Sequence, residues 1–483
     1  MEKNVKIAED FMNILFVKTS IGSWIESTVD LGVASISANL KKNGYKVNYF
    51  LVDNWESLKQ LFFRIDNFNP EVVCFSSYES TCKSINKLIS IIKKKYPKKI
   101  IICGGVHIIL SPENYIKNKN IDAVCLGEGE YVLVDFLNKL SRNDDYKQTI
   151  GFWVRDGDLI IKNKRAKTIE NIDKLPDPDR EIFYNEGLLY NPAVGEGIKK
   201  TIEFIFSRGC IYNCSYCSNH ALKAVYGKNY VRFRSPKKAI KEITTVLNKY
   251  EADYLVFHDD SFTVNKKWMN EFLDIYKKNI NIPFRCNARA DLCNENVFKS
   301  LKEANCDCVQ FGLESGDSDM RENLLDRHMS DMAIINAFNL AKKNGLRTGA
   351  FVMIGLPKET PEKFKKTIEL VARINADKYY LYVFRPYQST KLYNYCKKNK
   401  MIQPQNGNFI EWHDSILKIP GFQKKDIKYY YSNFNQLVVV CQKYLNSQNY
   451  KFIRKLIFDL YCIPPSNSLL FHFLRILFFI FGK

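Results

Sequence analysis

The chain has 483 residues, more than one ordinary hydrophobic core accommodates, so two or three domains are expected. Its content of 46% apolar and 14% aromatic residues is that of a folded protein and excludes a disordered chain. The formal net charge is +20, but the lysines are spread along the whole chain and form no basic stripe interleaved with aromatic residues. We therefore expect no nucleic-acid partner.

Most of the 14 cysteines stand singly in apolar runs, as Cys74, Cys103 and Cys125 do, which is typical of buried free thiols. The polar, acidic start of the sequence, MEKNVKIAEDF, is not a secretory signal. We expect a reducing cytoplasmic location and no disulfide framework.

Residues 1–145 alternate between strand and helix patterns. Short apolar runs predict strands at 13–19, 45–53, 71–77 and 98–105 and at the start of 121–130. Helical spacing falls between them, at 30–44, 57–68, 80–96 and 132–141. Strict alternation predicts an α/β fold with a flavodoxin-like, doubly wound parallel sheet, whose ligands sit at the carboxyl ends of the strands.

Two glycine-rich turns stand at such strand ends. GGVH (104–107) follows the fourth strand, and GEGE (127–130) follows the fifth. Glycines let a backbone approach a bulky ligand closely, although a glycine after a strand is more often only a turn. No G-x-G-x-x-G follows the first strand and no Walker A pattern occurs, so neither a dinucleotide nor a nucleotide fingerprint is present.

Residues 146–200 are predicted to link two domains. Residues 151–163 form a hairpin pattern around Asp156-Gly157, and the Pro-rich stretch 171–183 is an extended connector. Residues 201–400 then repeat a strand–helix pattern six times. The strands are predicted at 201–207, 253–259, 283–288, 306–314, 347–355 and 377–384, with helices near 236–250, 266–279, 294–304, 330–344 and 361–374. Six such units predict a partial TIM-like barrel, followed by a mostly helical region, 401–483.

Polar clusters end each of the six predicted strands, on the rim where barrel active sites lie. In chain order these clusters are Cys210, Cys214 and Cys217; His258, Asp259 and Asp260; Asn287, Arg289 and Asp291; Glu314; Gly355 and Pro357; and Arg385 and Tyr387. A capping or surface role explains any one of them equally well, but it explains all six together much less well.

The three cysteines have C-x3-C-x2-C spacing. Two cysteines would indicate a disulfide or redox pair and four a closed metal site, whereas three leave one coordination position open. A 4Fe–4S cluster held by three thiolates fits this pattern. The alternative is a zinc site in which His220 is the fourth ligand.

The stretch SRGCIYNCSYC (207–217) resembles the cluster loop of radical S-adenosylmethionine (SAM) enzymes. Further segments are similar to the subgroup that carries a cobalamin-binding domain before the radical domain. They are GGVHIILSPE, GEGE, LPDPDR, HDDSFT, GLESG, LLDRHMS, GLPKET and FRPYQSTKLY. The resemblance covers residues 12–400.

This resemblance implies roles for individual residues. Cys210, Cys214 and Cys217 would hold the 4Fe–4S cluster, whose open iron would chelate the amine and carboxylate of SAM. The SAM contacts would be Tyr216 and Gly355 for the adenine, Asp259 or Asp260 for the amine, Arg289 for the carboxylate, and Glu314 for the ribose or methionine part. Gly104, Gly105, Gly127 and Glu128 would line the cobalamin cradle.

The loop after the first strand, TSIGSWIES (19–27), lacks the cobalt-ligating His of many cobalamin domains. Cobalamin would then bind without a protein His below the metal. His107 is expected near the corrin but not as a cobalt ligand.

The sequence thus predicts a cobalamin-dependent radical SAM methyltransferase that acts on an unactivated carbon or a phosphorus centre through a 5′-deoxyadenosyl radical. An external one-electron reductant of the flavodoxin or ferredoxin type would feed the cluster. The alternatives are a radical rearrangement or cyclisation without methyl transfer, and a non-catalytic zinc-stabilised binding protein.

The C-terminal stretch LLFHFLRILFFIFGK (469–483) is strongly apolar but shorter than the roughly 20 residues that a membrane-spanning helix needs. Basic residues precede it at Lys451, Arg454 and Lys455. These features predict a peripheral contact with the inner face of a membrane and a small-molecule or lipid substrate. The alternative is a helix packed on the protein itself or on a partner.

Overall fold

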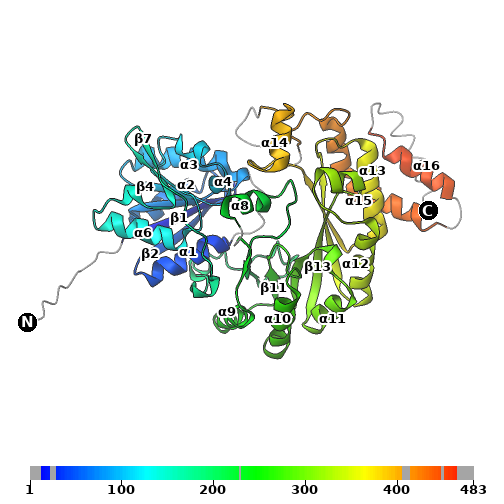
Figure 1. Cartoon of the computed structure of the whole chain (residues 1–483), viewed down its shortest axis with the longest axis horizontal. Coiled ribbons are helices and arrows are strands. Elements are labelled where there is room, and N and C mark those ends of the chain that lie inside the picture. The colour runs from blue at the N-terminus through cyan, green and yellow to red at the C-terminus, as the bar shows by residue number, and fades with distance from the viewer. Residues whose placement is uncertain (1–11, 22–28, 228–229, 405–413, 448–450, 465–483) are drawn as a thin grey trace, which may run out of the picture. The chain divides into compact units, whose positions relative to one another are not determined.

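A computed structural model describes residues 12–21, 29–227, 230–404, 414–447 and 451–464 (Figure 1). The chain forms two compact units. The first comprises Met1–Ile205 with Leu222–Arg234, and the second comprises Phe206–Ala221 with Ser235–Lys483.

The first unit is built on a seven-stranded sheet with the order β2-β1-β3-β4-β5-β6-β7. Its strands are β1 (Asn13–Thr19), β2 (Lys46–Val52), β3 (Val72–Ser76), β4 (Ile100–Gly104), β5 (Ala123–Cys125), β6 (Phe152–Asp156) and β7 (Leu159–Lys162). The first five pair in parallel, in the 2-1-3-4-5 order of flavodoxin-like folds, which confirms the predicted fold class. The predicted hairpin forms as β6 and β7, but it extends this sheet as an antiparallel edge.

Helices cover both faces of this sheet because alternate strand residues point to opposite sides. Ile14 and Phe16 pack under α1 (Leu31–Lys42) and α6 (Gly129–Ser141). Leu15 and Val17 belong to the opposite core, which is closed by α2 (Leu58–Phe68), α3 (Cys82–Lys95), α4 (Val106–Leu110) and α5 (Pro112–Ile116). The remaining elements up to β8 are η1 (Glu79–Thr81), η2 (Tyr146–Gln148), η3 (Ile172–Lys174) and α7 (Glu181–Tyr184).

The GEGE segment differs from the sequence prediction. It was expected to be a turn before a helix at 132–141, but α6 already begins at Gly129. A Cβ atom on Gly129 would lie 2.7 Å from Ile36 Cδ1 of α1, so the missing side chain lets the first turn of α6 pack closely there.

The second unit contains most of a six-stranded sheet with the order β15-β14-β13-β12-β11-β8. Its strands are β8 (Thr201–Phe204), β11 (Tyr254–Phe257), β12 (Phe284–Ala288), β13 (Cys306–Glu314), β14 (Arg347–Ile354) and β15 (Lys378–Val383), and β8 directly precedes the unit boundary. Neighbours from β11 to β15 pair in parallel. This open arc confirms the predicted partial barrel.

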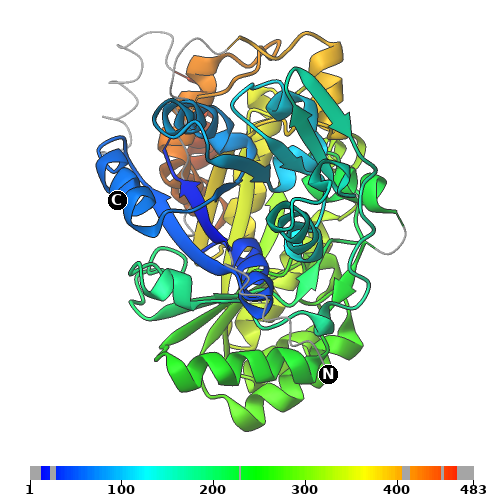
Figure 2. The ribbon, with the colours of Figure 1, turned by 90° about the vertical axis from the view of Figure 1, so that its left-hand side faces the viewer.

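The helices of this unit lie on one side of its sheet (Figures 1 and 2). They are α9 (Pro236–Lys249), α10 (Lys266–Asn279), α11 (Glu295–Glu303), α12 (Asp331–Lys343) and α13 (Pro361–Ile374). Phe311 of β13 shows the packing: its ring lies 6.2 Å from Phe298 of α11 and 4.9 Å from Phe338 of α12. Each helix begins with an N-cap residue whose side chain accepts a backbone N–H of the first turn. These N-cap residues are Ser235, Asn265, Asn294, Ser330 and Thr360.

The shorter segments β9 (Ser207–Arg208), α8 (Ser218–Tyr226), β10 (Arg232–Phe233), η4 (Ala290–Leu292) and η5 (Met320–Leu324) connect these elements. The C-terminal region is helical, as predicted, with α14 (Lys391–Lys398), α15 (Lys424–Leu445) and α16 (Lys451–Tyr461). Most of the loop 19–27 and the whole apolar stretch 469–483 lie outside the described residues. In the part of the chain that is described, no helix combines the length and apolar character needed to span a bilayer.

The turn after β4 yields a stability prediction. Gly105 has φ +101°, and a Cβ there would lie 2.7 Å from Ser77 O and 2.8 Å from Ser77 N. Gly105→Ala should therefore lower the free energy of unfolding by about 3 kcal/mol, measured by urea denaturation of the cofactor-free protein. The neighbouring Gly104→Ala is the matched control, because its Cβ would meet nothing closer than 3.7 Å. Equal effects of the two substitutions would contradict this account.

Candidate active site

The three cysteines of the C-x3-C-x2-C motif lie in the loop between β9 and α8. Cys214 is buried, and Cys210 and Cys217 are half-buried. Ser215 ties the loop to the segment after η5: its N–H donates to Leu325 O at 2.9 Å and its hydroxyl to Leu324 O at 2.5 Å. The loop is therefore held from within the barrel unit.

Two buried arginines face Cys214. Arg289 Nη1 lies 3.9 Å and Arg327 Nη1 lies 3.7 Å from its Sγ, and each residue is only 6% exposed. Arg289 is fixed by two 3.0 Å bonds to Asp291 and by stacking of its guanidinium 3.6 Å above the Tyr212 ring. The Cys214 sulfur, a ligand atom that an iron–sulfur cluster would use, therefore lies beside two guanidinium groups.

The thiols of Cys210 and Cys217 both have raised pKa values. Burial raises the pKa of Cys217 to about 12, although bonds from Asn219 oppose this, and the charge of Asp260 adds to the increase. Burial also raises the pKa of Cys210, where Asp260 again contributes. Metal binding is what stabilises thiolates in such a setting, so the donor set fits a bound cationic centre.

A single zinc ion does not fit these residues. Among the described residues, no three His, Cys, Asp or Glu side chains converge on a point where one ion could bind. His220 Nε2 accepts the N–H of Lys391 at 3.0 Å, whereas the buried Nδ1 has no hydrogen-bond partner. The thiolates of a 4Fe–4S cluster each bind a different iron and need not converge, so the loop fits a cluster and disfavours the Cys3His alternative.

Asp259 and Asp260 lie on the same rim but differ in environment. Asp259 is 2% exposed, and its Oδ1 accepts the Phe206 N–H at 3.0 Å and the Ser207 hydroxyl at 2.5 Å. Its Oδ2 is buried and has no partner, and burial raises the pKa of this carboxyl to about 6. A free buried acceptor of this kind fits a cationic ligand group. Asp260 is exposed and is hydrogen-bonded to Asn219.

Glu314 ends β13 with φ +68°, a strained conformation for a residue other than glycine. Burial raises the pKa of its carboxyl, while the charge of Arg327 and a hydrogen bond with Tyr216 oppose the increase. Glu314, Tyr216 and Arg327 therefore form one polar group beside Cys214.

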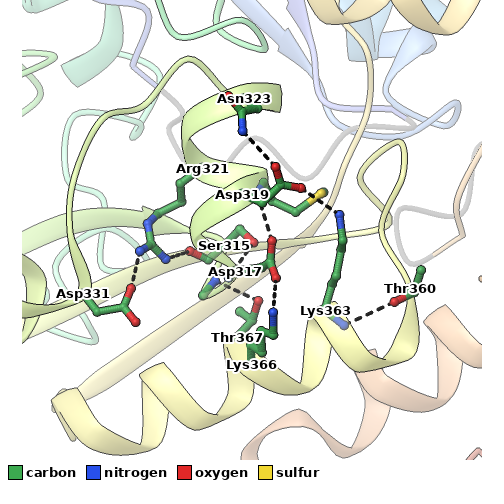
Figure 3. A network of polar contacts seen from close by, with 12 residues as sticks. Ser315, Asp317, Asp319, Arg321, Asn323, Asp331, Thr360, Lys363, Lys366 and Thr367 are labelled. Carbon is green, nitrogen blue, oxygen red and sulfur yellow. Dashed lines mark hydrogen bonds and ion pairs between the residues drawn. The ribbon is translucent and has the colours of Figure 1, made fainter.

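A network beyond Glu314 holds this strained position in place (Figure 3). Two residues of α13 take part. Thr367 Oγ1 accepts the Gly316 N–H at 2.8 Å, and Lys366 pairs with Asp317 at 2.8 Å. Fully buried Arg321 donates to Ser315 O at 2.8 Å and pairs with Asp331. A Cβ on Gly316 would lie 2.4 Å from the α13 backbone, so only glycine allows this approach. The network thus fixes where Glu314 and Arg327 lie.

Gly355 follows β14 at the same rim. Its N–H donates to Glu359 Oε2 at 2.6 Å, and that of Leu356 does so at 3.1 Å. Glu359 is fully buried, and burial raises the pKa of its carboxyl to about 8. In the GLPKET segment, the Glu359 carboxylate therefore holds the loop by accepting two of its backbone N–H groups. The sequence alone does not show this contact.

The inner face of the sheet carries half-exposed aromatic side chains and buried polar ones. Phe351 lies 5.1 Å from Tyr380 and 6.2 Å from Tyr382, measured between ring centroids. Gln310 Nε2 donates to Tyr380 Oη at 3.0 Å and its Oε1 accepts from Arg285. This face offers flat apolar surface with a polar floor.

In the first unit, the predicted cobalamin residues divide into two kinds. Both carboxylate oxygens of Glu128 accept from Arg232, at 2.8 and 2.9 Å, so this side chain anchors β10. Position 105 must be a glycine because a Cβ there would collide with the backbone of Ser77. Gly127 is different: a Cβ there would lie 3.7 Å from Tyr226 Oη, a buried hydroxyl without a hydrogen-bond partner. An open glycine beside a free hydroxyl at the end of β5 fits a bulky polar ligand such as a corrin.

His107 is buried beneath the β3 and β4 strand ends. Its Nε2 pairs with Glu79 at 2.6 Å and its Nδ1 contacts Tyr115 Oη at 2.9 Å. Burial lowers its pKa, but bonds to Cys82 and Glu79 outweigh this and raise the pKa to about 9. The His107 ring is thus held between Glu79 and Tyr115.

The sequence alone does not identify three further residues as individual site candidates. Arg327 stands only within the LLDRHMS segment, and no motif marks Tyr212 or Tyr226. Tyr212 lies inside the cysteine motif, so its position was a usable signal. Arg327 is 113 residues from Cys214 in sequence, and no local pattern shows their contact.

Comparisons with known proteins agree with this geometry. Residues 204–371 match the family model of the Radical SAM superfamily, and residues 24–137 match that of the B12 binding domain. An uncharacterized methyltransferase of Pyrococcus horikoshii is 27% identical over 75% of this chain and 77% of its own. An anaerobic magnesium-protoporphyrin IX monomethyl ester cyclase of Rubrivivax gelatinosus is 24% identical over 75% of this chain and 65% of its own.

Among solved structures, the cobalamin-dependent S-adenosylmethionine radical enzyme OxsB, with aqua-cobalamin and S-adenosylmethionine bound, matches with a TM-score of 0.70. The match covers 98% of this chain and 76% of that one at 14% identity, so it shows a shared fold.

The buried carboxyl of Asp259 yields a pH prediction. Its folded pKa of about 6 exceeds the ordinary value of 3.8, so the folded state holds the proton more tightly and stability falls as pH rises from about 3.8 to about 6. The loss amounts to about 3 kcal/mol. Asp259→Asn cannot ionise, so its stability relative to the wild type should rise by that amount across this window, measured by urea denaturation of the cofactor-free protein. The exposed Asp253→Asn is the control. Parallel pH profiles of the wild type and Asp259→Asn would disprove the assignment.

Proposed function

This chain is a radical SAM enzyme with an N-terminal B12-binding domain, and on that premise we propose that it is a methyltransferase acting on an unactivated carbon or a phosphorus centre. The observation that carries the proposal is the three-cysteine loop in which two buried guanidinium groups face Cys214. A non-catalytic zinc protein has no use for such an arrangement.

Cys210, Cys214 and Cys217 would hold the cluster, and Gly127 and Tyr226 would contact cobalamin. When bound, the reduced cluster and SAM supply a 5′-deoxyadenosyl radical, and cobalamin supplies the methyl group. An external one-electron reductant of the flavodoxin or ferredoxin type would provide the electron.

The side chains of this protein would bind and orient SAM. The free Oδ2 of Asp259 is a ready acceptor for the ammonium group of the methionine part of SAM. Arg289 and Arg327 add positive charge beside the cluster loop and so balance thiolates and the SAM carboxylate. Tyr216 and Glu314 would contact the adenosine part, and the loop of Gly355 would lie against the adenine.

The inner sheet face would hold the substrate and exclude water. Phe351, Tyr380 and Tyr382 present apolar surface, and Gln310 presents a fixed amide below it. These side chains suit a small molecule or a lipid with a flat or extended apolar part. We also propose that residues 469–483 make a peripheral membrane contact, because their sequence is strongly apolar and too short to span a bilayer.

The second candidate function is a radical rearrangement or cyclisation without methyl transfer. The similarity to the magnesium-protoporphyrin ester cyclase favours it, although the match spans 65% of that protein. The same cysteine loop and cofactors would serve either reaction.

Replacing one cluster cysteine tests the radical SAM chemistry. Cys214→Ala, reconstituted anaerobically with iron and sulfide, should bind well below the roughly four irons of a complete cluster and should lose 5′-deoxyadenosine formation by at least about 100-fold. Cys293→Ala is the matched control: Cys293 is a half-buried thiol near Arg289 but outside the motif, and its loss should leave both readouts unchanged. Full SAM cleavage by the Cys214 variant would refute the assignment.

Labelled SAM separates the two candidate functions without a known substrate. With methyl-labelled SAM, cobalamin and reductant, a methyltransferase should form S-adenosylhomocysteine along with 5′-deoxyadenosine, because SAM is also the source of the methyl group. Liquid chromatography with mass spectrometry measures both products. 5′-Deoxyadenosine alone, with no S-adenosylhomocysteine above that of a cobalamin-free control, would favour the rearrangement or cyclisation.

A further inference from the structure

The last described helix, α16, carries an exposed apolar stripe. Phe452 is 80% exposed, Leu456 is 49% exposed, and Ile463, in the turn that follows the helix, is 51% exposed. At 100° per residue Phe452, Leu456 and half-buried Leu460 fall within an arc of about 80°, so they form one strip along the helix, and Ile463 follows it in the next turn. We call Phe452, Leu456, Leu460 and Ile463 the α16 stripe.

The opposite side of α16 is docked on the barrel unit. Phe458, Tyr461 and Cys462 are buried, and Tyr429 of α15 donates its hydroxyl to Tyr461 O at 2.7 Å. Asp459 pairs with Lys365 of α13. The helix, at the right of Figure 1, is therefore fixed in rotation, and the exposed stripe lies on another side of the helix from these buried residues.

The part of the sequence that carries the stripe is basic. Residues 440–483 contain six Lys or Arg and one acidic residue, Asp459, whose carboxylate is already paired with Lys365. Lys455 is exposed beside the stripe. Exposed apolar side chains flanked by cations are what a helix at an anionic lipid surface presents.

Two other occupants fit less well. A stable dimer interface needs about 20–30 residues on each side, whereas the stripe has four. The apolar segment 469–483 has 11 apolar residues among its 15, more apolar surface than one narrow stripe can cover. A lipid surface has no fixed area, so it can cover both the α16 stripe and the segment 469–483.

We propose that α16 lies against an anionic membrane surface through Phe452, Leu456, Leu460 and Ile463, in addition to the membrane contact proposed for residues 469–483. The inference rests on the membrane contact proposed above and adds to it a folded helix with a fixed orientation. The barrel unit would then meet the lipid along α16 in one orientation, whereas the segment 469–483 alone does not specify one.

The test is co-sedimentation of the full chain, purified anaerobically with its cofactors, with vesicles of phosphatidylcholine alone or mixed equally with phosphatidylglycerol. Phe452→Ser combined with Leu456→Ser should weaken binding to the anionic vesicles at least about tenfold, because each side chain loses the burial it gains in lipid. Lys455→Glu should weaken binding to the anionic vesicles severalfold and leave binding to phosphatidylcholine unchanged. Phe63→Ser and Met332→Ser are matched controls, since these side chains are 70% and 62% exposed on α2 and α12.

Truncation before residue 465 separates this inference from the membrane contact itself. If truncation removes binding while the double α16 variant binds like the wild type, the stripe has no role and the inference is wrong. If neither change affects binding, both proposals fail. A shift of the double variant from dimer to monomer in light scattering, with unchanged vesicle binding, would assign the stripe to a second copy of the chain and overturn the lipid assignment. Thermal melts confirm that each variant is folded.

Discussion

A sulfur atom facing two buried guanidinium groups is the constraint on which the barrel unit depends. Arg289 and Arg327 are each 6% exposed, and burying a cation costs free energy unless an anion or a set of acceptors compensates it. The structure supplies partial compensation through Asp291, Gly312 O and Glu314, and it leaves one donor of each arginine directed at Cys214. Cys214 Sγ is therefore the point at which the two guanidinium groups meet.

Much of the surrounding architecture holds these groups in position. Tyr212 supports Arg289 from inside the motif, and Ser215 fastens the motif to the segment that carries Arg327. The network of Figure 3 fixes the strained Glu314 and the chain between β13 and α12. All of these contacts join protein groups, so the fold itself positions the site residues. Positioning of this kind lowers the ordering cost of binding.

Two buried carboxyl groups of the barrel unit lower the stability of the folded protein. Asp259 Oδ2 is buried without a partner, and its pKa of about 6 means that the folded state resists ionisation. Burial raises the pKa of Glu359 further, to about 8, and this carboxyl accepts the Gly355 N–H of its own loop. Groups that destabilise the free protein and suit a ligand are expected at functional sites, where stability is exchanged for activity.

The sequence by itself determined the element order, both fold classes and the cysteine motif, because strand and helix periods and motif spacing are local properties of the chain. It placed Cys210, Cys214, Cys217, Asp259 and Glu314 at strand ends, and parallel topology brings such ends to one rim. Only the tertiary structure decided that Arg327 faces Cys214, that Glu128 is occupied by Arg232 and that Tyr226 lies beside Gly127. Those pairs are separated by about a hundred residues, and long-range contacts follow from packing, which no local pattern encodes.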